Sequence, residues 1–179
     1  MDGVNKRIIA KEDDVVLREF MDSDIPKMAA YANNKKVFDN VRDAFPHPYS
    51  LADAKSFINM TGSLDPKTIF AIEYKGEYVG NIGLHLASDV YRKSAEIGYF
   101  IGEPFWNKGI VTTAVCLITE WGFKNLDIVR IFTGVFEFNK ASQRVLEKCG
   151  YTREAVFRKS VFKNGIYLNE VRYAKIKDE

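Results

Sequence analysis

The stretch of sequence that decides the fold runs from residue 95 to residue 115 and reads AEIGYFIGEPFWNKGIVTTAV. Its first seven residues predict a buried strand, and the apolar residues from Ile110 onward recur at helical spacing, which predicts a helix ending near Phe123. The first turn of that helix has no Asp or Glu, and Lys108 precedes it although a helix N-terminus disfavours positive charge. A strand therefore leads through a short loop into a helix whose positive end lacks a negative partner.

Such a helix start is suited to an anion, because its unpaired N–H groups and its dipole both favour negative charge. Gly109 leaves room for a phosphate near the backbone, Lys108 adds a full charge, and Thr112 adds a hydroxyl donor. The alternative is structural: Asn107 caps the helix and Lys108 is a solvated surface residue. The glycine patterns of P-loop NTPases and of dinucleotide-binding folds are both missing from the sequence, so neither kind of phosphate ligand is expected.

Elements on both sides of this stretch are predicted from periodicity and turn residues. Strands are expected at 15–20, 69–74, 78–86 and 128–135, helices at 25–32, 50–60 and 139–149, and an irregular loop at 33–49. Asn164-Gly165 predicts a type I′ turn between two final strands. Several strands are joined by hairpins while helices alternate with them, so we expect a mixed sheet with helices on both faces. Residues 1–179 are expected to form one domain, since no linker or repeat divides them.

Composition limits the class of protein. The chain is 46% hydrophobic and 13% aromatic, which is typical of a folded globular protein. A formal net charge of +2 gives no strong field for nucleic acid, and no apolar run is long enough to span a bilayer. Cys116 and Cys149 are expected to be reduced packing residues, and His47 and His85 lack the spacing of metal ligands. These features predict a soluble, cytoplasmic protein that holds no metal and binds neither nucleic acid nor a membrane.

Two motifs, AEIGYFIGEPFWNKGIVTTAV and NKASQRVLEKCGY at 139–151, resemble the GNAT N-acetyltransferase superfamily. The segment FPHPYSLADAKSFI at 45–58 is similar to the branch of ribosomal-protein N-terminal acetyltransferases of the RimJ/RimL kind. This resemblance implies an α/β (α+β) fold with a mixed, mostly antiparallel sheet and a cofactor cleft between two splayed parallel strands. It also implies acetyl-CoA as cosubstrate and direct transfer of the acetyl group to a primary amine.

The resemblance further implies which residues contact acetyl-CoA. The family's loop-to-helix motif, Gln/Arg-x-x-Gly-x-Gly/Ala, corresponds to residues 106–111, where Gly109 matches and Val111 replaces the last glycine or alanine. Backbone N–H groups near Phe100 and Ile101 are expected to hold the oxyanion, which is usually the largest catalytic contribution. The full set of expected cofactor contacts is Phe100, Ile101, Asn107, Lys108, Gly109, Val111, Thr112, Asn139 and Ser142.

Transfer to an amine requires a base, because an alkyl ammonium has a pKa of about 10. Glu96 is the candidate base, since period two places it on the same strand face as Gly98, where a polar group has room to approach. Many relatives carry a glutamate at this strand position as the base. The alternative is a structural carboxylate paired with Arg92 or another cation.

Ser142 is the candidate donor to the leaving thiolate. Relatives often carry a tyrosine acid one turn further along this helix, but Leu146 occupies that position here. Arg42, Phe45 and His47, from the irregular loop, are expected to contact the acceptor. That acceptor is expected to be a protein N-terminus or a small amine. The loop at 33–49 has only Asp39 and Asp43 against three cations, which favours a peptide or an amine with an uncharged tail over a polyamine. A homodimer is common in this branch. The competing hypothesis is a catalytically weak module that binds or senses acyl-CoA.

Overall fold

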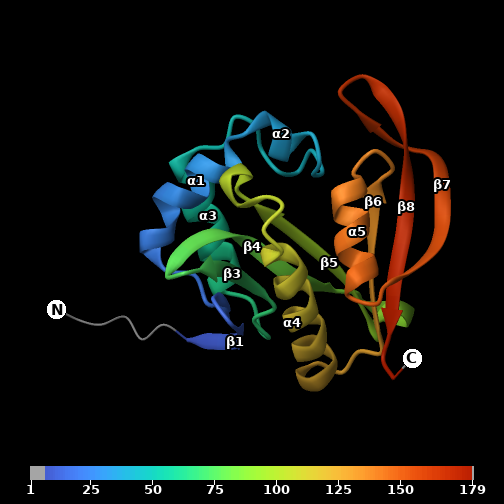
Figure 1. The fold of residues 1–179 in the computed structure, drawn as a ribbon, viewed down its shortest axis with the longest axis horizontal. Coiled ribbons are helices and arrows are strands. Elements are labelled where there is room, and N and C mark those ends of the chain that lie inside the picture. The colour runs from blue at the N-terminus through green and yellow to red at the C-terminus, as the bar shows by residue number, and fades with distance from the viewer. Residues whose placement is uncertain (1–6, 179) are drawn as a thin grey trace.

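The computed structural model describes residues 7–178. Its strands are β1 (Ile8–Glu12), β2 (Val15–Arg18), β3 (Ile69–Tyr74), β4 (Glu77–Leu86), β5 (Ser94–Ile101), β6 (Arg130–Phe136), β7 (Thr152–Lys163) and β8 (Ile166–Ile176). They form one sheet in the order β1-β2-β3-β4-β5-β6-β8-β7 (Figure 1). The pair β5 and β6 is parallel and the other neighbours are antiparallel, so the predicted mixed, mostly antiparallel sheet is confirmed.

Helices cover both faces of this sheet, as expected. They are α1 (Ile25–Ala32), α2 (Lys35–Phe38), α3 (Leu51–Gly62), α4 (Ile110–Asn125) and α5 (Lys140–Lys148), with short 3-10 turns at Asp22–Asp24, Asp89–Tyr91 and Glu103–Phe105. Helices α4 and α5 pack on one face, called here the α4 face, through a large apolar cluster. Helices α1, α2 and α3 pack on the opposite face, called here the α1 face, through a smaller cluster.

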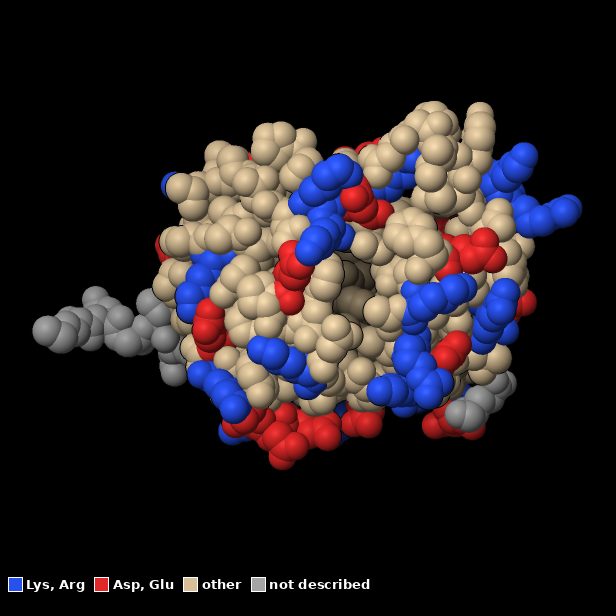
Figure 2. Space-filling model, turned by 45° about the horizontal axis from the view of Figure 1, so that its top comes forward, with Lys and Arg blue, Asp and Glu red and all other residues tan. Residues whose placement is uncertain are grey.

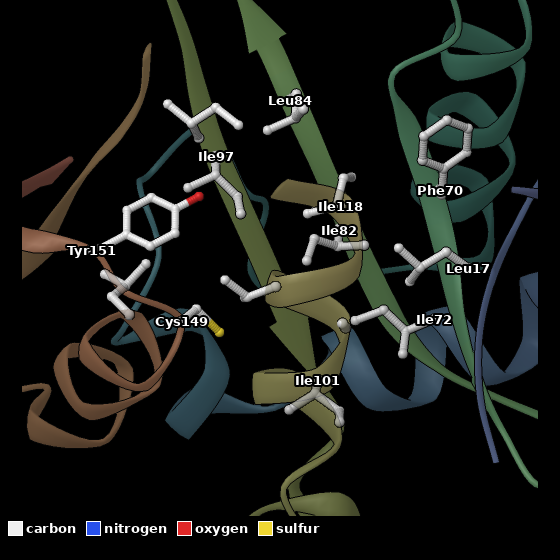
Figure 3. Packing of buried hydrophobic residues seen from close by; sticks show 14 of the residues in the cluster. Leu17, Phe70, Ile72, Ile82, Leu84, Ile97, Ile101, Ile118, Cys149 and Tyr151 are labelled. Atoms are coloured by element: carbon white, nitrogen blue, oxygen red, sulfur yellow. The ribbon is translucent and has the colours of Figure 1, made fainter. Parts of the chain in front are cut away.

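Strand β5 shows how the sequence divides its side chains between these faces. Ile97 and Ile101 belong to the cluster under α4, whereas Phe100 belongs to the cluster under α1 and α3. Figure 3 shows Ile82 and Ile97 directed from the sheet toward Ile118 of α4. The stripe predicted for α4 is buried in this contact, since Ile110 and Ile118 are 2% and 0% exposed. Residues that alternate along β5 therefore reach opposite sides of the sheet.

The sheet opens between β5 and β6. These strands pair only at Ser94↔Arg130, Ala95↔Ile131 and Glu96↔Phe132. Beyond that point β5 stays paired with β4 as far as Ile101, and β6 stays paired with β8 as far as Phe136. The two parallel strands therefore diverge in the middle of the sheet, which is the splay that the family resemblance implied.

Two local expectations are wrong, and the structural alternative for the start of α4 is not realised. The loop predicted to be irregular contains α2, whose start is capped by the Asn34 side chain accepting a hydrogen bond from the Lys36 N–H at 2.8 Å. Helix α4 is not capped by Asn107, because Gly109 occupies the N-cap position with a φ of 77°. The expected reduced thiols, Cys116 and Cys149, form a disulfide between α4 and the end of α5, with Cα atoms 5.4 Å apart. Contact between these two helices brings the cysteines together, although 33 residues separate them in the sequence.

Every helix within residues 7–178 is too short or too polar to span a bilayer. The same residues contain no cluster of three or more His, Cys, Asp or Glu side chains that could hold a metal ion.

Candidate active site

A cleft of about 1290 Å³ passes through the opening between β5 and β6. Its walls include the start of α4, the first turns of α5, the facing stretches of β5 and β6, and the segment between α2 and α3. Figure 2 shows the molecule hollowed near the centre of one face, with tan atoms inside and both blue and red side chains around the rim. Because the cleft crosses the sheet, residues from its two faces share one continuous space.

The start of α4 forms one wall and has the geometry of an anion site. Gly109 has a left-handed backbone, and a Cβ placed there would meet nothing within 4 Å. The first hydrogen bond of the helix runs from the Thr113 N–H to the Gly109 carbonyl at 3.1 Å. The N–H groups of Ile110, Val111 and Thr112 therefore precede the first intrahelical hydrogen bond and can donate to a ligand. Lys108 lies beside them with its Nζ 5.4 Å from the centre of the Phe105 ring. Val111 also lines the cleft, and its side chain packs against the apolar cluster of the α4 face.

The start of α5 brings the predicted donor into the cleft. Asn139 caps the helix, since its Oδ1 accepts a hydrogen bond from the Ser142 N–H at 3.0 Å. The Ser142 Oγ lies 2.8 Å from the Tyr99 hydroxyl oxygen on β5. Burial raises the pKa of Tyr99 to about 12, and the hydrogen bond with Ser142 opposes that shift. Tyr99 therefore keeps its proton at neutral pH and forms a hydroxyl pair with Ser142.

On the α1 face, two predicted residues come together. The guanidinium of Arg42 donates to the carboxylate of Glu96, forming an ion pair in which the Glu96 side chain is 21% exposed. The cation paired with Glu96 is thus Arg42 and not Arg92, whose guanidinium donates to the Asp89 carbonyl. His85 lies directly across from Glu96 on β4 and also lines the cleft.

Only part of the predicted acceptor site lies at the cleft. The Phe45 ring packs edge-on against the Phe100 ring with 5.3 Å between their centres, and both residues line the cleft. His47 does not, because its ring stacks on Phe38 at 5.0 Å and the residue is not part of the cleft wall. Aromatic packing turns the His47 ring toward α2, and the contact of His47 with the acceptor stays a prediction.

Sequence reasoning missed Tyr99 and His85. The alternation of side chains along a strand places Tyr99 on the face of β5 opposite Glu96. The sequence around Tyr99 does not indicate that α5 packs on that face, so its contact with Ser142 could not be predicted. The signal for His85 depends on the register of β4 against β5, which the sequence between them does not fix. Both residues enter the site through contacts between segments that are distant along the chain.

Known proteins resemble this chain over most of its length. A family profile described as an acetyltransferase (GNAT) domain matches residues 14–152. The uncharacterized N-acetyltransferase YoaA of Bacillus subtilis (strain 168) is 30% identical over 174 residues, covering 94% of this chain and 97% of YoaA. The microcin C7 self-immunity acetyltransferase MccE, solved with acetyl-CoA and AMP, is 28% identical with a TM-score of 0.77, covering 92% of this chain and 93% of that one. RimL, a ribosomal L7/L12 α-N-protein acetyltransferase solved with coenzyme A, is 22% identical with a TM-score of 0.85, covering 96% and 99%.

Proposed function

The chain belongs to the GNAT family of N-acetyltransferases, and we propose that it transfers the acetyl group of acetyl-CoA directly to a primary amine, either a peptide N-terminus or a small amine. The observation that carries this proposal is the cleft between β5 and β6. It joins the anion-binding start of α4 on one face of the sheet to the carboxylate of Glu96 on the other. Such a passage suits a reaction in which a phosphate-bearing donor and an amine meet from opposite sides.

The cofactor side fits a pyrophosphate. Gly109 leaves open space above the backbone, and the helical backbone aligns the N–H groups at the start of α4 so that their dipoles favour an anion there. Lys108 and Thr112 add a positive charge and a hydroxyl at the same wall of the cleft. Acetyl-CoA supplies an activated acyl group when bound, and the N–H groups of β5 near Phe100 and Ile101 would stabilise negative charge on the acyl oxygen.

Glu96 is the proposed base on the acceptor side. A carboxylate accepts the proton that an alkyl ammonium must lose before its nitrogen can attack, and Glu96 lies at the cleft wall in a half-buried position. The Arg42 guanidinium holds this carboxylate through a charge-assisted hydrogen bond. Glu96 is therefore oriented before the acceptor enters.

The Tyr99–Ser142 pair is the proposed source of the proton for the leaving thiolate. Ser142 alone is a poor acid, but its Oγ can pass a proton to the thiolate while receiving one from the Tyr99 hydroxyl at 2.8 Å, and water then returns a proton to Tyr99. The requirement is modest, since a thiol has a pKa of about 8.5 and its thiolate needs little assistance. This pair replaces the tyrosine that relatives carry on α5, where this chain has the buried Leu146.

The experiment that tests the proposal measures release of free thiol from acetyl-CoA in the presence of a panel of peptides and small amines. Amine-dependent release supports it. The second candidate function, an acyl-CoA-binding or sensing module, is favoured by one observation: Glu96 is already engaged with Arg42. That module would be stabilised by acetyl-CoA without releasing thiol above the rate in buffer. A homodimer also stays a proposal, and light scattering in solution would test it.

A further inference from the structure

Besides Glu96, the cleft wall includes Asp53, whose carboxylate accepts hydrogen bonds from Ser50 at the start of α3, and Glu170. Neither the sequence pattern nor the proposed reaction uses Glu170. Glu170 of β8 is 7% exposed and forms part of the cleft wall. It pairs across the sheet with Phe136 of β6, and its carboxylate lies over Gly134 of the same strand. A Cβ at Gly134 would come within 2.3 Å of the Glu170 Cδ, so the carboxylate occupies the space that any other residue at 134 would fill.

Gly134 belongs to an opening in the sheet. The last pair between β5 and β6 is Glu96↔Phe132, and two residues beyond it stand Gly98 and Gly134, both of which line the cleft. Their missing side chains would point to the α1 face, the same face as Glu96 and Glu170. The opening therefore has one carboxylate on the β5 side and another on the β8 side.

The Glu170 carboxylate has a cationic neighbour on its own strand. Within residues 7–178 its polar contact is the Arg172 Nε, 2.7 Å from its Oε1. That contact is poorly aligned, because the buried Arg172 Nε has no hydrogen-bond partner among those residues. The ion pair with Arg172 uses Oε1, and Glu170 lines the cleft. A group that enters the cleft with charged N–H donors can therefore bind the second carboxylate oxygen, Oε2.

We infer that Glu170 contacts the acceptor and binds a positively charged group other than the amine that is acetylated. This inference rests on the proposed acetyl transfer. Glu96 lies on β5, whose N–H groups face the reacting acyl carbon in that proposal, so the reacting amine belongs on its side of the opening. Glu170 lies on β8, and β6 stands between β8 and β5. Two strand spacings are about 10 Å where the strands pair, and the separation is larger at the opening because β5 and β6 no longer pair there. The acceptor would thus carry two ammonium groups, as in a free diamine or in a peptide whose first residue is lysine.

The test compares matched acceptors on matched variants. Putrescine and butylamine share a carbon chain but differ in the second ammonium, and lysinamide and norleucinamide make the same comparison for an α-amine. Glu170→Gln removes the charge, and Gly134→Ala displaces the carboxylate by its added Cβ. Glu154→Gln is the control, because Glu154 pairs with Arg130 outside the cleft. Thermal melting with and without acetyl-CoA reports whether each variant folds and binds its cosubstrate.

Both cleft variants should raise the KM for the doubly charged acceptors by about 10-fold, the worth of one hydrogen bond to a charged group. The KM for the singly charged partners and the acetyl-CoA shift should stay within about 2-fold. Putrescine against lysinamide shows which source of the second ammonium the site prefers. Equal changes for singly and doubly charged acceptors, or no change for either, overturn the inference.

A failure of acetyl transfer itself would look different, because the unmodified protein would then release no thiol with any amine. The inference would still be decided by calorimetric titration of putrescine into protein saturated with coenzyme A. Weaker binding to Glu170→Gln than to Glu154→Gln supports it, and equal binding or none overturns it.

Discussion

The hydrogen bond between Tyr99 and Ser142 allows the leaving-group proposal to be tested by removing one hydroxyl at a time. Tyr99→Phe deletes only the Oη that lies 2.8 Å from the Ser142 Oγ, and Ser142→Ala deletes the Oγ. If Tyr99 acts through Ser142, its loss matters only while the serine is present. The double variant should then have the same kcat as Ser142→Ala.

The size of each effect follows from the contact. One neutral hydrogen bond contributes about 1 kcal/mol, which corresponds to about 5-fold in rate, so Tyr99→Phe should lower kcat by about that factor. Ser142→Ala removes the group nearest the sulfur and should lower kcat by about 100-fold or less, the low end for acid–base catalysis. Neither change should raise the KM for acetyl-CoA alone, because the interaction is needed in the transition state.

Thiol release at saturating acetyl-CoA measures kcat for the four proteins, and thermal melting checks that each variant folds. Tyr151→Phe is the matched control, since its hydroxyl lies 2.7 Å from the Thr119 Oγ1 in the core and the residue does not line the cleft. It should lose stability and keep kcat. Losses that multiply in the double variant would refute the relay, because independent sites behave that way. A folded Ser142→Ala with full kcat would show that the thiolate takes its proton from water.

Three further outcomes are expected. Acetyl-CoA, but neither ATP nor NAD, should raise the melting temperature, with about 2.7 kcal/mol of added stability at one hundred times its Kd. Gly109→Glu should abolish this shift, because it places a carboxylate against the phosphates. No shift of the unmodified protein at millimolar acetyl-CoA would contradict the cofactor site. Glu96→Gln should lower kcat most at low pH and recover as the amine deprotonates toward its pKa of about 10, whereas a pH-independent loss means that Glu96 only positions other groups. The pKa of Tyr99 is raised from 10.0 to about 12, so its contribution to the stability of the folded protein is intact below pH 10 and is lost as the pH rises toward 12. The free energy of unfolding, measured by urea titration, should therefore fall less steeply between pH 10 and 12 for Tyr99→Phe than for the unmodified protein. An equal fall for both proteins would contradict the raised pKa.

The parts of the fold that sequence reasoning predicted well are those with local signals. Helix α1 and strand β3 have the predicted bounds, because periodicity identifies them directly. Ser50 caps α3 through the Asp53 N–H at 3.2 Å, as its residue type indicated. Asn164 and Gly165 have φ values of 51° and 79°, which agree with the predicted type I′ turn between β7 and β8.

The parts that were missed depend on distant contacts. Strand β1 has an exposed, mixed sequence with no clear alternation, and pairing with β2 makes it a strand. The disulfide between Cys116 and Cys149 forms because α4 and α5 lie together on one face, which no spacing along the chain indicates. The ring of His47 turns to Phe38 because α2 exists, and α2 is too short to predict from periodicity.

The candidate site divides in the same way. Period two correctly separates Glu96 and Tyr99 onto opposite faces of β5, which by itself argues against their sharing a site. The splay of β5 from β6 removes that objection, because one cleft then reaches both faces. Gly98 and Gly134 mark the place where this happens. A local reading gives Gly98 only room for a polar group beside Glu96, and gives Gly134 only a weak point in a strand. The proposed reaction needs groups from both faces of the sheet, and the residues that provide them share a cleft only because β5 and β6 stop pairing.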